Sequence, residues 1–290
     1  MTSGTAKARN FNAVIGNSIA NRILYGADMQ LTINRIDTRY VLDNEGGGPW
    51  LVFIHQLAGD LSVWDQMAGY FRRDFTVLRY DLRGHGDTAV SPDGFTIDDL
   101  ADDLATLLDK LGAPSAHVAG LSIGGMVAQK LAIRHPGKVD TLTVVGAPAF
   151  IPEDARPTFA QRAASVRENG TASIVEATLE RWLTPEFRKA HPEVVEQIGE
   201  SIARTPAEGF ARAAEAVSRF DARDKLASVN KRTLVVAGQH DVGTPHAASK
   251  VVADTVPGAQ FELLNAAHLS PVEESQRFSA LLGNFLRGTA

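Results

Sequence analysis

Short apolar runs alternate with amphipathic segments along most of the chain, and this alternation predicts the fold class. The runs predicted as strands are residues 50–55, 76–81, 116–121, 139–147, 233–238 and 261–264. Segments with apolar residues at helical spacing lie between these runs, as at residues 96–111. Strands that alternate with helices form parallel sheets covered on both faces. We therefore predict an α/β fold with a mostly parallel, doubly wound sheet.

A hairpin is predicted ahead of the first buried strand. Residues 29–35 and 38–43 both have the pattern of strands, and the two residues between them, Ile36 and Asp37, are predicted to form the turn. A short loop of this kind joins antiparallel strands. We therefore expect the sheet to be mostly, but not wholly, parallel.

Two helix starts have the spacing of a capping box, in which two side chains each bind a backbone N–H of the first turn. Thr96 stands three residues before Asp99, and Ser270 stands three residues before Glu273. Proline follows Ser270, as is common in a first turn. We predict a capping box at both places.

The strand pattern is interrupted between residues 148 and 220, where only helical runs occur. We predict that residues 148–220 form a helical cap inserted into a core made by residues 29–147 and 221–290. Residues 1–28 contain no acid before Asp28 and are expected to be a leader, either loosely ordered or an arm that packs on a second subunit of a homo-oligomer.

Composition excludes several classes of function. The 290 residues are 44% hydrophobic and carry a net charge of −5, so neither nucleic acid nor an anionic membrane is an expected partner. The chain has no cysteine, which rules out disulfides and thiolate chemistry. No run is long enough for a membrane span, and residues 1–28 lack a secretory apolar core. A cytoplasmic location is the expectation.

One short motif suggests covalent catalysis. The stretch Gly120-Leu121-Ser122-Ile123-Gly124 has the G-x-S-x-G spacing of a nucleophile elbow. In such an elbow the serine lies on a sharp turn between a strand and a helix, and small neighbours let these two elements approach closely. Because apolar and helical patterns flank the motif on the correct sides, we predict that Ser122 is a nucleophile.

A serine nucleophile needs a base and an orienting acid, and both are found beyond strand ends. His268 follows the strand at residues 261–264, and Asp241 follows the strand at residues 233–238. The chain order Ser, Asp, His is the one expected when such residues occupy the carboxyl edge of a sheet with a nucleophile elbow. We predict a catalytic triad of Ser122, Asp241 and His268.

An oxyanion formed at the attacked carbon needs two N–H donors. Ile123 would supply one at a helix N-terminus, and Leu57, in the loop after the strand at residues 50–55, would supply the other. Gln56 could narrow the substrate pocket or add a polar contact to it. Met126, one turn after Ser122, and Trp182, in the predicted cap, are the further pocket candidates.

Other polar motifs are predicted to be structural. His240 and His246 flank Asp241 without any metal-ligand spacing, so no metal is expected. Residues 84–86 do not form a dinucleotide loop, because no G-x-G-x-x-G follows a strand. Asp81 and its neighbours are expected to tie strands together. No cofactor is predicted.

The chain resembles the α/β-hydrolase superfamily from about residue 29 onward, and within it the 3-oxoadipate enol-lactonases. The stretches that carry the resemblance are Leu61-Ser62-Val63-Trp64-Asp65, Arg79-Tyr80-Asp81-Leu82-Arg83-Gly84-His85-Gly86, Gly120-Leu121-Ser122-Ile123-Gly124-Gly125-Met126-Val127, Glu180-Arg181-Trp182-Leu183-Thr184-Pro185 and Ala267-His268-Leu269. The resemblance implies the same triad, the same two oxyanion donors and no metal or organic cofactor. The chain differs from these lactonases at His55-Gln56-Leu57 and in its long leader, which leaves the substrate open.

We therefore expect a cofactor-free serine hydrolase that cleaves a small ester or lactone through an acyl-enzyme. The same fold also supports carbon–carbon bond hydrolases, perhydrolase-type haloperoxidases and cofactor-free oxygenases, and these alternatives stay open. A non-catalytic small-molecule receptor is the alternative from another class. Epoxide hydrolases and dehalogenases are excluded, because they need an aspartate at the position of Ser122.

Overall fold

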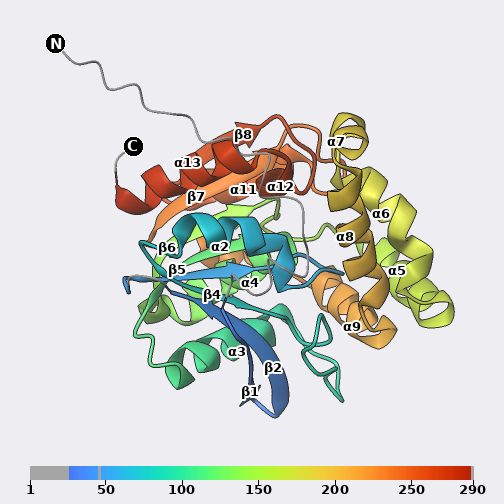
Figure 1. Cartoon of the computed structure of the whole chain (residues 1–290), viewed down its shortest axis with the longest axis horizontal. Coiled ribbons are helices and arrows are strands. Elements are labelled where there is room, and N and C mark those ends of the chain that lie inside the picture. Colours follow the sequence, from blue (N-terminus) through green and yellow to red (C-terminus); the bar gives the residue numbers. More distant parts are fainter. Residues whose placement is uncertain (1–25, 45–46, 289–290) are drawn as a thin grey trace.

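A computed structural model describes residues 26–44 and 47–288 of the chain, and the strands in these ranges form one sheet (Figure 1). The eight strands lie in the order β1-β2-β4-β3-β5-β6-β7-β8. Both β1 and β2 pair antiparallel, and all the other neighbours are parallel. Their bounds are β1 Asp28–Ile33, β2 Ile36–Asp43, β3 Trp50–Ile54, β4 Thr76–Tyr80, β5 Ala116–Leu121, β6 Val139–Val145, β7 Arg232–Gly238 and β8 Gln260–Leu264.

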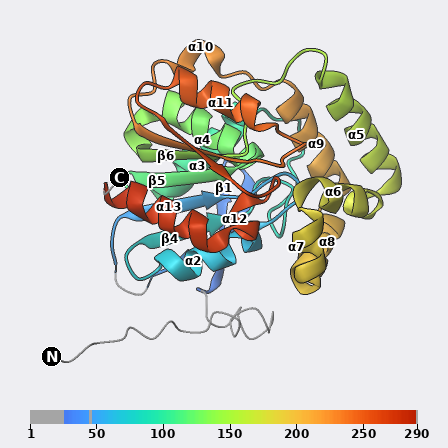
Figure 2. The same ribbon diagram turned by 90° about the horizontal axis from the view of Figure 1, so that it is seen from above.

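Helices cover both faces of this sheet, so the predicted fold class is confirmed (Figure 2). One face carries α2 (Asp65–Phe71) and α13 (Ser275–Arg287), and the other carries α3 (Ile97–Lys110), α4 (Ile123–Arg134) and α11 (His246–Thr255). Shorter elements join them: η2 Leu61–Trp64, η3 Pro136–Lys138, α10 Arg223–Leu226 and α12 Ser270–Glu273. None of the helices in the described ranges is both long enough and apolar enough to cross a bilayer.

The predicted position of the hairpin turn is wrong. The turn lies at Asn34 and Arg35, whose φ angles are 46° and 70°, and Ile33 pairs with Ile36 directly across it. These angles are those of a type I′ turn, which needs positive φ at both central positions, and asparagine tolerates this better than a β-branched residue. Ile36 is instead a buried strand residue.

One of the two predicted capping boxes is also wrong. Thr96 and Asp99 form theirs, with each side chain bound to the backbone N–H of the other. Ser270 Oγ, in contrast, is buried without a hydrogen-bond partner among the described residues. The side chain of Glu273 turns away from Ser270 and accepts hydrogen bonds from Ala267 and Thr184.

The chain between β6 and β7 is helical, and we call residues 148–220 the cap segment. Its helices are α5 Arg156–Asn169, η4 Thr171–Ile174, α6 Val175–Trp182, α7 Pro185–Ala190, α8 Pro192–Arg204 and α9 Ala207–Ser218. A β-bridge between Phe150 and Asp221 brings the two ends of the segment together. In Figures 1 and 2 these helices lie together beyond one end of the sheet. That residues 148–220 form a unit separate from the core stays a prediction.

The cap segment contacts loops that follow core strands at their carboxyl ends. After β3, Asp60 accepts a hydrogen bond of 2.7 Å from Ser201 of α8. After β4, the backbone of Gly84 approaches Gly209 of α9 so closely that a Cβ on Gly84 would lie 2.5 Å from the Gly209 Cα. These contacts hold the cap segment over the edge of the sheet where catalytic residues were predicted. The predicted leader, residues 1–28, lies outside the described residues except for its last three.

Candidate active site

Ser122 joins β5 to α4 through a strained turn. Its φ and ψ angles are 57° and −118°, and its N–H donates a 2.8 Å hydrogen bond to Val145 O. Positive φ is uncommon for a residue with a Cβ and often marks a functional site. A Cβ on Gly120 would lie 2.0 Å from Gly124 O, and one on Gly124 would lie 2.3 Å from Ile54 O. Both glycines are therefore required by close backbone contacts at this turn.

The close approach of Gly124 to Ile54 O gives a prediction about stability. Alanine normally stabilises a helix relative to glycine, but Gly124→Ala is expected to lower the free energy of unfolding by about 2 kcal/mol or more, because the new methyl group collides with backbone. Gly137→Ala is the matched control, since no atom of the described residues lies within 4 Å of its Cβ position. We expect the control to stay within about 1 kcal/mol of the wild type in urea unfolding. Equal midpoints for the two variants would contradict the explanation.

Asp241 and His268 are hydrogen-bonded to each other at the carboxyl ends of β7 and β8. The distance from His268 Nδ1 to Asp241 Oδ2 is 2.6 Å, and both residues are about 95% buried, with exposed fractions of 4% and 5%. The other carboxylate oxygen, Oδ1, accepts N–H bonds of 2.8 Å from Gly243 and Thr244. Because the carboxylate accepts from Nδ1–H, the imidazole is oriented with Nε2 free to act as a base.

Gly146, which follows β6, connects this pair to Ser122. A Cβ on Gly146 would lie 3.5 Å from both Asp241 Oδ2 and His268 Nδ1. The residue before it, Val145, accepts the hydrogen bond from Ser122 N–H. The structure thus places the three predicted triad residues at one sheet edge, after β5, β7 and β8, with β6 between β5 and β7. The direct side-chain contact that it shows among them is the one between Asp241 and His268.

The two predicted oxyanion donors lie on adjoining backbone segments. Ile123 is the first residue of α4, where a helix leaves its N–H groups without internal partners. Leu57 lies just beyond β3, and Gly124 packs against the end of that strand, since its Cβ position is 2.3 Å from Ile54 O. Within the described ranges, neither N–H donates to a protein acceptor. Together they can bind an oxyanion at the positive end of α4.

A buried histidine holds the loop that carries Leu57. His55 Nδ1 lies 2.7 Å from Gln56 O, and its Nε2 accepts a 2.9 Å bond from Leu82 N–H. Because Nε2 accepts a hydrogen bond, it carries no proton, and the neutral ring joins the loops after β3 and β4. Burial also lowers the pKa of His55. The Gln56 side chain turns toward its own loop, with Nε2 2.4 Å from the Cβ position of Gly59. Its predicted role in the pocket stays a prediction.

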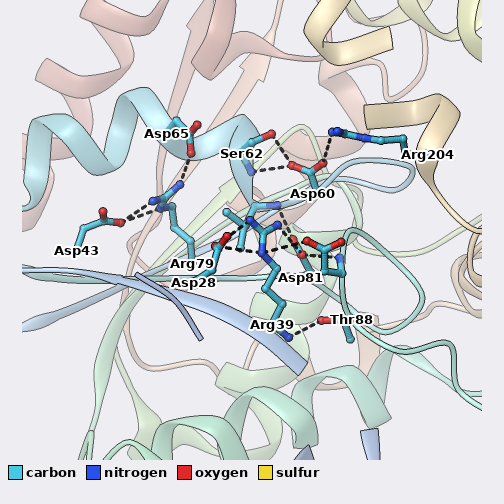
Figure 3. Close-up of polar contacts among 12 residues, drawn as sticks. Asp28, Arg39, Asp43, Asp60, Ser62, Asp65, Arg79, Asp81, Thr88 and Arg204 are labelled. Carbon is cyan, nitrogen blue, oxygen red and sulfur yellow. Dashed lines mark hydrogen bonds and ion pairs between the residues drawn. The ribbon is translucent and has the colours of Figure 1, made fainter. Parts of the chain in front are cut away.

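Asp81 has the structural role predicted for it, beneath the same loop (Figure 3). Its carboxylate accepts bonds from Leu61 N–H at 2.7 Å and Asp87 N–H at 3.0 Å, and pairs with Arg39 at 3.2 Å. Burial raises the pKa of Asp81. The neighbouring His85 has a pKa lowered to about 3 by burial, so it is neutral under ordinary conditions.

Asp60 is a link between core and cap segment that sequence reasoning missed. It accepts a hydrogen bond from Ser62 N–H at 2.9 Å, and Arg204 lies 3.6 Å away (Figure 3). It also accepts a 2.7 Å bond from Ser201 Oγ of α8. Burial by itself would raise the pKa of Asp60, but the bonds from Ser62 and Ser201 outweigh it and lower the pKa. The bond from Ser62 is a local N-cap of η2, but no local pattern reveals the link to the cap segment, because Ser201 and Arg204 are distant in sequence.

Trp182 lies against the candidate base. Its ring stacks on that of His268 with centroids 6.0 Å apart and planes 29° apart, and its carbonyl accepts a 3.0 Å bond from Leu269 N–H. Trp182, at the end of α6, is 8% exposed. Met126 is buried in the first turn of α4, where its N–H donates to Ser122 O at 3.1 Å. Contact of either side chain with a substrate stays a prediction.

Two arginines of the cap segment have no acidic partner among the described residues. Arg162 of α5 lies over the ring of Phe210, 5.6 Å from its centroid. Burial and the nearby charge of Arg181 lower the pKa of Arg162 to about 10. Arg181, next to Trp182, donates a 3.3 Å hydrogen bond to Thr178 Oγ1. Two half-buried cations without a counter-ion favour an anionic ligand.

His240 and His246 do not form a metal site with Asp241. His240 Nε2 lies 2.9 Å from Asn265 Oδ1, and His246 is exposed at the start of α11. Among the described residues there is no group of three histidine or carboxylate side chains placed to hold a metal ion.

The sheet, the elbow and the histidine–aspartate pair define the class to which the protein belongs. Residues 49–275 match the family described as the alpha/beta hydrolase fold, which is most of the chain. The protein is a member of this family.

Its relatives are more specific. The chain is 34% identical to 3-oxoadipate enol-lactonase 2 of Acinetobacter baylyi over 249 residues, covering 86% of this chain and 92% of the relative. The solved enol-lactonase of Burkholderia xenovorans is 31% identical, with a TM-score of 0.86 over 89% of this chain and 100% of that one. A thermophilic esterase of Thermogutta terrifontis, solved with malate bound, is 29% identical, with a TM-score of 0.85 over 91% and 99%.

Proposed function

We propose that the protein is a cofactor-free serine hydrolase that cleaves a small carboxylic ester or lactone through an acyl-enzyme. The observation that carries this proposal is the 2.6 Å bond between His268 and Asp241 at the sheet edge where Ser122 occupies its strained turn. An oriented imidazole at the same sheet edge as a half-buried serine on a strained turn is the arrangement that acyl transfer needs.

The first half of the reaction forms the acyl-enzyme. Ser122 Oγ attacks the carbonyl carbon while His268 Nε2 takes the hydroxyl proton. The carbonyl oxygen becomes an oxyanion, which the N–H groups of Leu57 and Ile123 bind. Each such donor typically lowers the barrier by roughly 2.7–4 kcal/mol. When the tetrahedral intermediate collapses, His268 returns the proton to the leaving oxygen.

The second half releases the acid. His268 deprotonates a water molecule, which attacks the ester on Ser122, and the same two N–H groups bind the second oxyanion. Collapse returns the proton to Ser122 Oγ and frees a carboxylic acid. In a lactone the alcohol and acid belong to one molecule, so a single product leaves. Asp241 keeps the imidazole in the required tautomer and stabilises its protonated form.

The substrate class that we propose is an enol-lactone with a free carboxylate. Of the relatives named above, one is a 3-oxoadipate enol-lactonase and another is an enol-lactonase. The compound 3-oxoadipate keeps one free carboxylate when its other carboxyl group closes a lactone. The unpaired cations Arg162 and Arg181 support a substrate of this charge, and Arg181 is the neighbour of Trp182, which stacks on His268.

Hydrolysis and active-site labelling together test the proposed function. We expect the purified protein to hydrolyse members of a panel of p-nitrophenyl esters, lactones and enol-lactones. A fluorophosphonate probe should label Ser122 stoichiometrically, as located by peptide mass spectrometry. The Ser122→Ala variant is the blank and should lose both turnover and labelling. Turnover that survives in this variant, or oxygen consumption in place of acid release, would refute the proposal.

The charge preference gives a separate prediction. Arg162→Met keeps the bulk of the side chain but removes its charge. A hydrogen bond to a charged group contributes about 1.5–3 kcal/mol. KM for a carboxylate-bearing lactone should therefore rise roughly 10- to 100-fold. KM for a neutral lactone of similar size should not change. Arg277→Met, on the exposed face of α13, is the control and should affect neither. Equal effects on both lactones would exclude Arg162 from recognition of the carboxylate.

A further inference from the structure

Glu273 binds two segments that meet beside the candidate base. It lies at the end of α12, five positions after His268. One oxygen, Oε1, accepts a 2.7 Å bond from Ala267 N–H, which belongs to the residue before the histidine. The other, Oε2, accepts from Thr184 N–H at 3.0 Å and from Thr184 Oγ1 at 2.5 Å. A single carboxylate therefore joins the histidine loop to the cap segment.

The same two segments contact each other around His268 itself. The ring of Trp182 stacks on the imidazole, and the next residue of the histidine loop, Leu269, donates its N–H to Trp182 O at 3.0 Å. Three consecutive residues, from Ala267 to Leu269, thus face residues 182–184 of the cap segment directly or through Glu273. The position of the imidazole is therefore fixed by contacts from both the core and the cap segment.

The chemistry of this contact requires a carboxylate. Three neutral donors converge on Glu273, and no cation pairs with it among the described residues. Both oxygens of an ionised carboxylate only accept, so they can serve both segments at once. A glutamine would point its NH2 group at one set of N–H donors and lose that contact. Hydrogen bonds to a charged acceptor are also shorter and stronger than neutral ones.

We propose that Glu273 is a positioning residue that seats His268 by tying its loop to residues 182–184 of the cap segment. The imidazole of His268 is then correctly oriented only while residues 182–184 of the cap segment contact the histidine loop. This inference rests on the proposed function, because it assigns Glu273 a role in the reaction of His268. Glu273 touches no reacting atom, and its effect passes through Ala267 and Thr184.

The test compares Glu273→Gln with Arg212→Gln. Arg212 also ties the cap segment to the core, through Ser91 O, but at α9 and away from the histidine loop. Because misplacing a catalytic group by about 1 Å can cost 100-fold, Glu273→Gln should lower kcat on p-nitrophenyl acetate by roughly 10- to 100-fold. KM should stay within about 3-fold, and the rate of fluorophosphonate labelling of Ser122 should fall in parallel with kcat. Arg212→Gln should keep kcat within about 3-fold of the wild type, even if its urea unfolding midpoint falls as much as that of Glu273→Gln.

A second pair of variants covers the case in which Glu273→Gln does not fold. Thr184→Val removes one donor to Glu273, and Thr184→Ser keeps it. We expect Thr184→Val to lower kcat by about 2- to 10-fold relative to Thr184→Ser, because one of three hydrogen bonds is lost. Three outcomes would overturn the positioning role, provided that the wild type is labelled. They are an unchanged kcat in both Glu273→Gln and Thr184→Val, an effect on KM alone, and an equal loss of kcat in Arg212→Gln. A wild type that is neither active nor labelled would instead refute the proposed function, and the positioning role with it.

Discussion

Replacing His268 by alanine is expected to lower kcat for ester hydrolysis by about a million-fold, the scale reached when a serine hydrolase loses its base. The variant lacks the group that takes the proton from Ser122 and later activates water. Its effect on binding is small by comparison, so KM should change little. Single-turnover acylation by p-nitrophenyl acetate and the rate of fluorophosphonate labelling measure the loss directly.

His246→Ala is the matched control for this experiment. His246 is an exposed histidine at the start of α11, and its replacement should leave kcat within about 2-fold of the wild type. If His268→Ala keeps more than about a hundredth of the wild-type kcat, a different residue must be the base for Ser122. Loss of the true base should lower kcat by far more than about a hundred-fold.

The second large effect is expected for Asp241→Asn, which should lower kcat by roughly 10⁴-fold. The geometry explains why an isosteric change is so damaging. Asp241 Oδ1 faces two N–H donors, from Gly243 and Thr244, and Oδ2 faces His268 Nδ1. The asparagine oxygen must remain with the two backbone donors, which turns its NH2 group toward the imidazole. His268 then has to accept at Nδ1 and carry its proton on Nε2, where it cannot act as a base.

Kinetics and thermal unfolding together check this prediction. Asp254→Asn, an exposed change on α11 that removes a surface pair with Lys250, is the control and should leave kcat within about 2-fold. Asp241→Asn should keep a folded structure, since every backbone donor retains an acceptor. If the variant retains a tenth of the wild-type kcat, tautomer control by Asp241 would be excluded.

Local patterns determined much of the fold. The alternation of apolar runs and helical segments predicted the covered, mostly parallel sheet, because burial on two faces leaves a continuous apolar run in each strand. The G-x-S-x-G spacing could also be recognised along the chain, although only one of its glycine contacts is local: the Cβ position of Gly120 meets Gly124 O, whereas that of Gly124 meets Ile54 O at the end of β3. The hairpin shows the limit of this approach: the turn was misplaced to Ile36 and Asp37, because strand ends can shift by a residue or two without changing the pattern.

The two predicted capping boxes show where prediction from neighbouring residues in the sequence fails. Thr96 and Asp99 bind each other's N–H groups, as their spacing indicated. Ser270 and Glu273 have the same spacing, but Glu273 binds Ala267 and, from 89 residues away, Thr184. Ala267 belongs to the histidine loop, but Thr184 belongs to the cap segment, and no pattern near Ser270 could reveal that donor.

The order of amino acids was enough to identify the residue types at the strand ends, and therefore the candidates Ser122, Asp241 and His268. Their surroundings became visible only in the folded chain: Trp182 is stacked on the imidazole, and Asp60 is bound to Ser201 across 141 residues. Helix periods, turns and caps could be predicted because they depend on neighbours along the chain. Contacts between core and cap segment depend on how whole elements pack, and that packing is settled by the entire chain at once.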